Sequence, residues 1–134
     1  MAGIPILGVF LSPLLRRPGH PRLWVSTGAR AGELGTEPKL VEYSYPHQEG
    51  WYAATRTRRV LVLPRDGEFT VFDTECTHLG CMVSWRADEK QFYCPCHGGI
   101  FDAQGHPVAG PVSEPLRRLP ARVSADGELQ VEES

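Results

Sequence analysis

The chain has 134 residues, of which 41% are hydrophobic and 22% charged, a composition that suits one small globular domain. Its formal net charge of −2 excludes a general electrostatic attraction to nucleic acid or to anionic lipid, so no nucleic-acid partner is expected. Fourteen glycines and twelve prolines argue against long helices and favour short strands joined by tight turns.

The N-terminal segment differs in composition from the rest of the chain. Residues Ala2–Leu15 form a mostly apolar run that ends at Arg16 and Arg17. The run is shorter than the roughly 20 residues that a helix needs to cross a bilayer, and it lacks the positive leader of a signal peptide. Two interpretations stay open at this point: an amphipathic or buried segment, or the outer part of a membrane anchor.

After a proline- and arginine-rich linker, the chain alternates short apolar segments with turn residues. We expect strands at residues 23–26, 39–45, 51–55, 58–63 and 68–73, the last two joined by a hairpin turn at "PRDG". A short strand, a turn and a proline loop are expected over residues 100–111, followed by a closing hairpin that turns at Asp126 and Gly127. The pattern predicts an all-β fold, either a small antiparallel β-sandwich or a partly open barrel.

Two expectations concern side chains of the central strands. Trp51 and Tyr52 are expected in the core of the β domain. The arginine-rich run "RTRR" at residues 56–59 is expected at a solvated strand edge.

All four cysteines lie in two pieces, "CTHLGC" at residues 76–81 and "CPCHGG" at residues 94–99, and each piece contains one histidine. A zinc ion takes four ligands and would leave two of these six side chains unused. Two structural disulfides would leave both histidines without a role. If each piece donates one cysteine and one histidine, the set matches the two thiolates and two imidazoles of a Rieske-type [2Fe–2S] centre. The remaining two cysteines, one per piece, can then form a disulfide.

The two pieces resemble the cluster-binding boxes of the Rieske iron–sulfur subunit of cytochrome bc and bf complexes, and the resemblance extends over roughly residues 22–131. It implies a Rieske fold with a cluster-binding subdomain of loops and short strands at about residues 74–115. It also implies that two cysteines bind an inner iron, two histidines an outer iron, and the other two cysteines a disulfide. These are, in that order, Cys76 and Cys94, His78 and His97, and Cys81 and Cys96.

The resemblance further implies residues that shield the cluster. "GPVSEP" at residues 110–115 is similar to the proline loop of the family, and Leu79 would be an exposed apolar residue against the wall of a quinone site. Glycines in the boxes would let the backbone approach the sulfurs and donate N–H groups. The expected shielding residues are Leu79, Gly80, Pro95, Gly98, Gly99, Phe101, Gly110 and Pro111.

Two of these positions depart from the ubiquinol-oxidising members of the family. Those members carry a serine where this chain has Gly99 and a tyrosine where it has Phe101, and both hydroxyls donate hydrogen bonds to sulfur. With fewer donors, the reduced and more negative cluster is less stabilised. We therefore expect a lower potential, which suits menaquinol as the electron donor.

The implied function is that of an electron-transfer subunit that is not catalytic on its own. It would accept one electron from a quinol held by a cytochrome b-type subunit, with a proton received by His78 or His97, and pass the electron to a c-type cytochrome. The alternative is the Rieske subunit of another oxidoreductase, such as arsenite oxidase. Ferredoxins of ring-hydroxylating oxygenases fit less well, because they usually lack the second cysteine pair.

The resemblance also favours the anchor interpretation of the N-terminal run. Residues 1–21 are then expected to be a partial membrane anchor and hinge linker, and residues 22–134 the [2Fe–2S] domain. The domain is expected at the cell membrane on its outer, extracytoplasmic face, because disulfides persist outside the reducing cytosol.

Overall fold

The computed structural model describes residues 22–133, so the expected anchor and hinge at residues 1–21 lie outside the described part of the chain. Among residues 22–133, no helix is long and apolar enough to cross a membrane. The elements in chain order are β1 (Leu23–Arg30), a 3-10 turn (Ala31–Glu33), β2 (Lys39–Glu49), β3 (Tyr52–Arg65), β4 (Glu68–Asp73), β5 (Ser84–Arg86), β6 (Gln91–Cys94), β7 (Gly99–Phe101), β8 (Pro107–Ala109), β9 (Arg118–Leu119), β10 (Ala121–Val123) and β11 (Glu128–Glu133).

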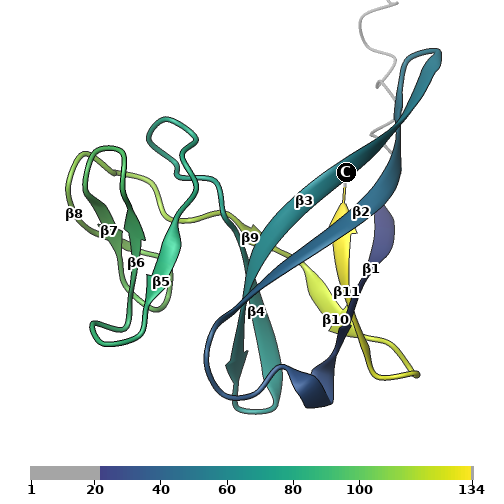
Figure 1. The fold of residues 1–134 in the computed structure, drawn as a ribbon, viewed down its shortest axis with the longest axis horizontal. Helices are drawn as coiled ribbons and strands as arrows, with labels where there is room; N and C mark the ends of the chain where they lie inside the picture. The colour runs from purple at the N-terminus through teal and green to yellow at the C-terminus, as the bar shows by residue number, and fades with distance from the viewer. Residues whose placement is uncertain (1–21, 134) are drawn as a thin grey trace, which may run out of the picture.

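The strands form three antiparallel sheets, which do not close into a barrel (Figure 1). Their orders are β1-β11-β10, β2-β3-β4-β9 and β5-β6-β7-β8. The first two sheets form the larger part of the domain, and the third forms a smaller part beside them. The prediction of an all-β antiparallel fold is confirmed.

The core of the larger part lies between its two sheets. Inward-facing residues alternate with outward-facing ones along β2 and β11, as a half-buried strand requires. The buried residues at this interface include Val41, Val60, Val62, Leu129 and Val131.

The strands of the long β2–β3 hairpin differ from the predicted strands in two ways. The strand predicted to end before Pro46 continues to Glu49, because β2 is an edge strand that tolerates a residue without an N–H donor. The two strands predicted at residues 51–55 and 58–63 are one continuous strand, β3.

The expectation that Trp51 and Tyr52 belong to the core is wrong. The hairpin pairs down to Glu49 and Tyr52, so these aromatic residues lie at its tip. Trp51 is 94% exposed and Tyr52 56% exposed. Their apolar character signalled burial, whereas their position at the turn places them beyond the sheets.

A second apolar core lies between the smaller part and the larger part, and both parts contribute residues to it. Phe92 and Phe101 from β6 and β7 are fully buried there together with Phe72 of β4. The Phe72 and Phe92 rings meet edge-to-face with centroids 5.3 Å apart. Because Phe72 belongs to the larger sheet, it fixes the smaller sheet against it.

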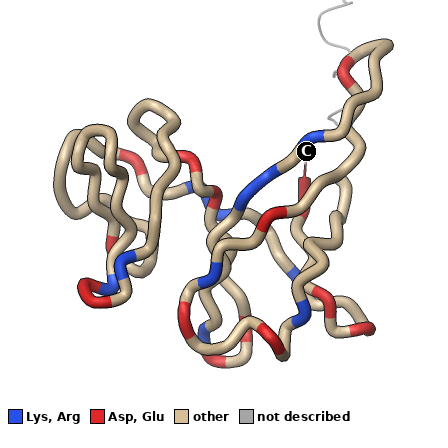
Figure 2. The backbone as a smooth tube through the Cα atoms, in the orientation of Figure 1, with Lys and Arg blue, Asp and Glu red and all other residues tan. Residues whose placement is uncertain are grey.

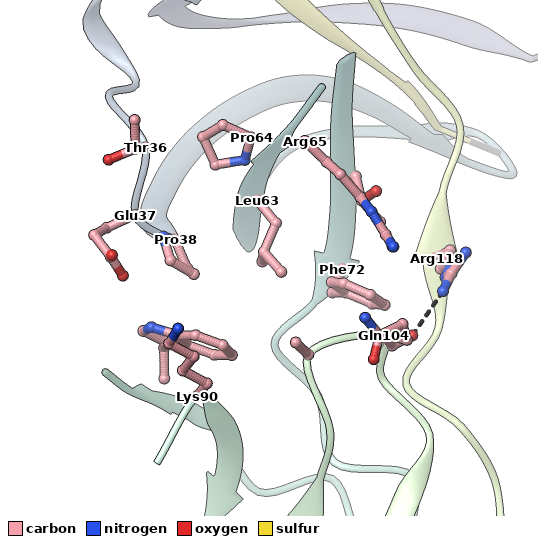
Figure 3. Close-up of a pocket in the computed structure, with 13 residues that line it drawn as sticks. Thr36, Glu37, Pro38, Leu63, Pro64, Arg65, Phe72, Lys90, Gln104 and Arg118 are labelled. Atoms are coloured by element: carbon pink, nitrogen blue, oxygen red, sulfur yellow. Dashed lines mark hydrogen bonds between the residues drawn. The ribbon is translucent and has the colours of Figure 1, made fainter. Parts of the chain in front are cut away.

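A cleft of about 300 Å³ lies between the two parts of the domain (Figure 3). At its edge, the guanidinium of Arg118 donates to the backbone carbonyl of Gln104 at 2.7 Å and lies over the Phe72 ring. The buried Trp85 Nε1–H, which also lines the cleft, has no hydrogen-bond acceptor among the described residues. None of the six expected cysteine and histidine site residues lines this cleft, so it is separate from the candidate metal centre.

Candidate metal centre

Two tight loops carry the six cysteine and histidine side chains. The first loop, residues 76–81, joins β4 to β5, and the second, residues 94–99, joins β6 to β7. In the first loop the Cys76 N–H donates to the Cys81 carbonyl at 2.8 Å. In the second loop the Gly98 N–H donates to the Cys94 carbonyl at 3.1 Å. Each loop therefore holds its own shape through backbone hydrogen bonds.

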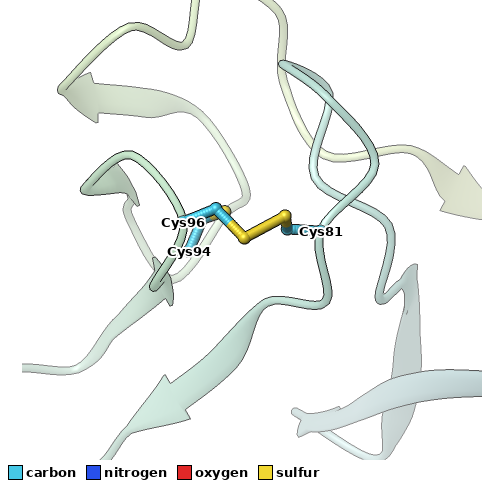
Figure 4. Close-up of side chains that lie close together, drawn as sticks. All are labelled: Cys81, Cys94 and Cys96. Atoms are coloured by element: carbon cyan, nitrogen blue, oxygen red, sulfur yellow. A yellow bond between two sulfur atoms is a disulfide. The ribbon is translucent and has the colours of Figure 1, made fainter.

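A disulfide between Cys81 and Cys96 joins the two loops, as the resemblance implied (Figure 4). The Cys94 sulfur belongs to the same group, and the three sulfurs lie within 4.8 Å of one another. Because Cys81 and Cys96 are bonded to each other, Cys94 is the member of this group that offers a free thiol.

The two free thiols, those of Cys76 and Cys94, are both buried. Burial raises the pKa of the Cys76 thiol, while backbone N–H groups of His78 and Leu79 that donate to its sulfur oppose this rise. Such donors also stabilise a thiolate bound to a metal. The two cysteines thus form a shielded sulfur pair at the base of the loops.

The two histidines lie on the outside of the same loops. His78 and His97 are both exposed, and their ring centroids lie 5.0 Å apart with the rings almost perpendicular. Each ring comes from a different loop, so the disulfide that joins the loops also keeps the two imidazoles together. The structure brings two exposed nitrogen donors close to each other beside two buried sulfur donors.

The expected proline loop, residues 110–115, contacts both cysteine-bearing loops. The Thr77 hydroxyl donates to the Glu114 carbonyl at 2.8 Å. Gly110 packs so closely that a Cβ on it would lie 2.5 Å from the Gly98 carbonyl oxygen. The candidate centre is therefore enclosed by three mutually fixed segments.

The two cysteine-bearing loops carry no charged side chain, although Asp73, Glu75 and Arg117 line the surface next to His78 and Leu79. Figure 2 shows no Lys, Arg, Asp or Glu in either cysteine-bearing loop. Leu79 is 68% exposed next to His78. Of the other expected shielding residues, the exposed ones are Gly80, Pro95, Gly110 and Pro111, the half-buried one is Gly98, and the buried ones are Gly99 and Phe101.

Sequence reasoning missed an ion-pair network behind the first loop. Arg58, expected at a solvated edge, is 20% exposed and pairs with Asp73 at 2.7 Å and with Glu133 at 2.5 Å. Glu133 also accepts hydrogen bonds from the hydroxyls of Tyr43 and Tyr45. Nothing local in "RTRR" distinguishes Arg58 from its neighbours, because both carboxylates come from distant strands.

The donors present fit a [2Fe–2S] cluster of the Rieske type. Such a cluster takes two thiolates on one iron and two imidazoles on the other. The described loops offer two free buried thiols and two adjacent exposed imidazoles, and the remaining two cysteines are already used in the disulfide.

Comparison with known proteins agrees with this donor set. The Rieske [2Fe-2S] domain family matches residues 41–120. The menaquinol:cytochrome c reductase iron-sulfur subunit of Geobacillus thermodenitrificans is 33% identical, and the match covers 89% of this chain and 76% of that protein.

Two further comparisons set the extent of the similarity. The cytochrome b6-f complex iron-sulfur subunit of Chlorobaculum thiosulfatiphilum is 38% identical over 51% of this chain, and the match spans only 38% of its length. The crystal structure of the plasma membrane Rieske protein of Synechocystis is 26% identical, with a TM-score of 0.58 over 81% of this chain and 97% of that one. The chain belongs to the Rieske [2Fe-2S] family of electron-transfer proteins.

Proposed function

We propose that this chain takes one electron and one proton from a quinol, in particular menaquinol, and passes the electron to a c-type cytochrome. The quinol would be held by a cytochrome b-type subunit of the same membrane complex. Relatives named as iron-sulfur subunits of menaquinol:cytochrome c reductase and of cytochrome b6-f complexes support the class of complex.

In this proposal Cys76 and Cys94 bind the inner iron, and His78 and His97 bind the outer iron. When bound, a [2Fe–2S] cluster with this ligand set supplies a one-electron carrier with a potential between about −150 and +300 mV. The buried cysteines keep water away from the sulfurs, and the histidines present their outer ring nitrogens to a partner.

The exposed imidazole pair is the observation that carries the proposal. An imidazole nitrogen at the surface can accept a hydrogen bond from a quinol hydroxyl and then hold its proton, which a thiolate ligand cannot do. The 5.0 Å separation of the rings lets one quinol head approach either of them. Leu79 and the uncharged loops around it offer the apolar contact that a quinol ring requires.

The proposal includes the division of the chain and its location. Residues 1–21 would tether residues 22–134 to the membrane, with about residues 74–115 forming the cluster-binding subdomain on the extracytoplasmic side. The disulfide between Cys81 and Cys96 supports an oxidising compartment.

The test combines ligand replacement with spectroscopy and quinol oxidation. The reduced wild-type protein should give a Rieske-type electron paramagnetic resonance spectrum. The oxidised protein should accept electrons from a short-chain naphthoquinol and pass them to a c-type cytochrome. His78→Ala and His97→Ala should each abolish the spectrum, whereas His106→Ala, a surface histidine outside both loops, should retain it.

Two results would contradict the proposal. A Rieske spectrum that survives His78→Ala would remove that histidine as an iron ligand. A wild-type midpoint potential that stays constant through the alkaline pH range would remove the coupling of electron and proton on which quinol oxidation depends.

A further inference from the structure

We propose that the tip of the β2–β3 hairpin seats in the headgroup region of a lipid bilayer through Trp51 and Tyr52. The inference rests on the proposed membrane attachment of this chain and extends it to a second, folded contact. It concerns a surface of the larger part of the domain, away from the two cysteine-bearing loops (Figure 1).

The exposure of the tip has no explanation within the described chain. Trp51 is 94% exposed, and its ring meets that of Tyr52 edge-to-face with centroids 6.2 Å apart. The strands pair fully down to Glu49 and Tyr52, so the two rings stand on an ordered hairpin. Large apolar side chains grouped on such an exposed feature mark a contact surface.

The chemistry of the tip fits the boundary between lipid and water. Trp and Tyr combine an apolar ring with one polar hydrogen-bonding group, and both are enriched where membrane proteins cross this boundary. The Glu49 carboxylate beside them is paired with Arg56 at 2.9 Å and lies 3.6 Å from His47. The tip therefore presents aromatic rings without a strong charge of either sign, which suits a zwitterionic lipid surface.

The position of the tip relative to the N-terminal segment also favours a bilayer. Leu23, which begins β1, pairs with Glu133, and the Glu133 carboxylate accepts a hydrogen bond from the Tyr45 hydroxyl at 3.2 Å. Tyr45 lies four residues before the end of β2, a distance of about 13 Å along a strand. The chain therefore enters the domain at the end of the sheets from which the hairpin tip projects, and the apolar run Ala2–Leu15 precedes that entry point in the sequence.

The same side of the molecule carries the candidate metal centre. In Figure 1 the hairpin tip at the upper right and the loop between β4 and β5 at the upper left point toward the same side. A bilayer that contacts the tip would therefore lie on the side toward which this loop points. A protein partner at the tip is the competing occupant, and the experiment below separates the two.

The experiment measures quenching of Trp51 fluorescence by lipid in the full chain with its cluster. The protein is mixed with phosphatidylcholine vesicles whose acyl chains carry bromine, and the emission of wild type is compared with that of Trp51→Phe. Trp24 and Trp85 are present in both proteins, so the difference reports Trp51 alone. We expect brominated vesicles to lower this difference emission at least twofold relative to unbrominated vesicles.

The matched control moves the fluorophore from the turn to the opposite end of the same hairpin. Leu40→Trp in the Trp51→Phe background places an exposed tryptophan on β2, roughly 30 Å along the strand from the tip. Its difference emission should be unaffected by bromine. Far-ultraviolet circular dichroism checks that each variant keeps the strand content of wild type.

Every other result overturns the proposal. Unquenched Trp51 emission in protein that sediments with vesicles would show that the tip does not contact lipid, and would favour a protein partner at this surface. Equal quenching at positions 40 and 51 would indicate nonspecific adsorption, and a chain that binds no vesicles would exclude the tip contact altogether. A Rieske spectrum is recorded on the same samples. Quenching tests the lipid contact and the spectrum tests the proposed cluster, so failure of the one proposal is distinguishable from failure of the other.

Discussion

The guanidinium of Arg58 lies 2.7 Å from the carboxylate of Asp73, three residues before Cys76. Its other terminal nitrogen lies 2.5 Å from the carboxylate of Glu133 in β11. Asp73 also accepts the backbone N–H of Glu75 at 3.2 Å. One cation thus connects the last described strand to the residues that begin the first cysteine-bearing loop.

Replacing this cation should destabilise the domain strongly. Arg58→Met leaves two carboxylates, 7% and 2% exposed, buried without their cation, a change that typically costs about 3–5 kcal/mol. Urea unfolding should show this loss. Arg59→Met is the matched control, because the pair of Arg59 with Glu42 is exposed and should contribute less than about 1 kcal/mol. Equal losses in the two variants would show that the network contributes no more than a surface pair.

Tyr43 gives the same network a dependence on pH. Burial, together with the hydrogen bond that its hydroxyl donates to Glu133, raises the pKa of Tyr43 far above its ordinary value of about 10. Above pH 10 the unfolded chain releases this proton while the folded chain retains it. The free energy of unfolding should therefore fall by roughly 1.4 kcal/mol per pH unit from this residue.

The variant Tyr43→Phe isolates that contribution. Chemical unfolding measured between pH 9 and about pH 11 should show a shallower fall in stability than wild type, because the variant has no proton to release at this position. Tyr52→Phe, at the exposed hairpin tip, should retain the wild-type slope. A wild-type slope in Tyr43→Phe would contradict the assignment.

Gly110 should be essential for the contact between the proline loop and the second cysteine-bearing loop. Its φ is +83°, and a Cβ would lie 2.5 Å from the Gly98 carbonyl oxygen. Gly110→Ala should therefore cost more than the roughly 1–2 kcal/mol of the backbone conformation alone and loosen the site. Gly28→Ala measures the conformational cost by itself, since Gly28 has a φ of +72° with open space around it. Thermal unfolding and cluster retention of the two variants provide the comparison, and similar losses would refute the close packing.

Features set by neighbouring residues were predictable from the sequence. The hairpin turn at residues 64–67 and β4 depend on local turn chemistry and alternation, and the structure has β4 at the expected residues. The paired boxes indicated a [2Fe–2S] centre because metal ligands are restricted to few residue types. The short strands β5 and β6 were missed, since three or four residues carry too little periodicity to signal a strand.

Features set by distant pairing were not predictable. Arg58 is partly buried because Asp73 and Glu133 approach it from β4 and β11, and no local pattern encodes that approach. Trp51 has the large apolar side chain typical of a core residue, yet the register of the β2–β3 hairpin places it at the turn. In both cases the tertiary arrangement determines whether the side chain is buried, and a sequence window of a few residues carries no information about that arrangement.

The last prediction concerns the effect of Gly99 and Phe101 on the midpoint potential of the cluster. A hydroxyl that donates a hydrogen bond to sulfur stabilises the reduced cluster more than the oxidised one, since reduction adds negative charge. A stabilisation of about 1 kcal/mol corresponds to some tens of millivolts, because a tenfold change in a one-electron equilibrium is about 59 mV. Gly99→Ser and Phe101→Tyr should therefore each raise the potential by that amount.

The packing around Gly99 determines how this has to be measured. A Cβ on Gly99 would lie 2.8 Å from Cγ1 of Val112, so serine at this position displaces the proline loop unless Val112 is shortened. The informative variant is Gly99→Ser combined with Val112→Ala, measured by protein-film voltammetry against Val112→Ala alone. We expect the double variant to lie some tens of millivolts above the single one. If the two potentials coincide and Phe101→Tyr is also unshifted, backbone donors and solvent exposure set the potential of this centre, and the inference from these two positions to menaquinol fails.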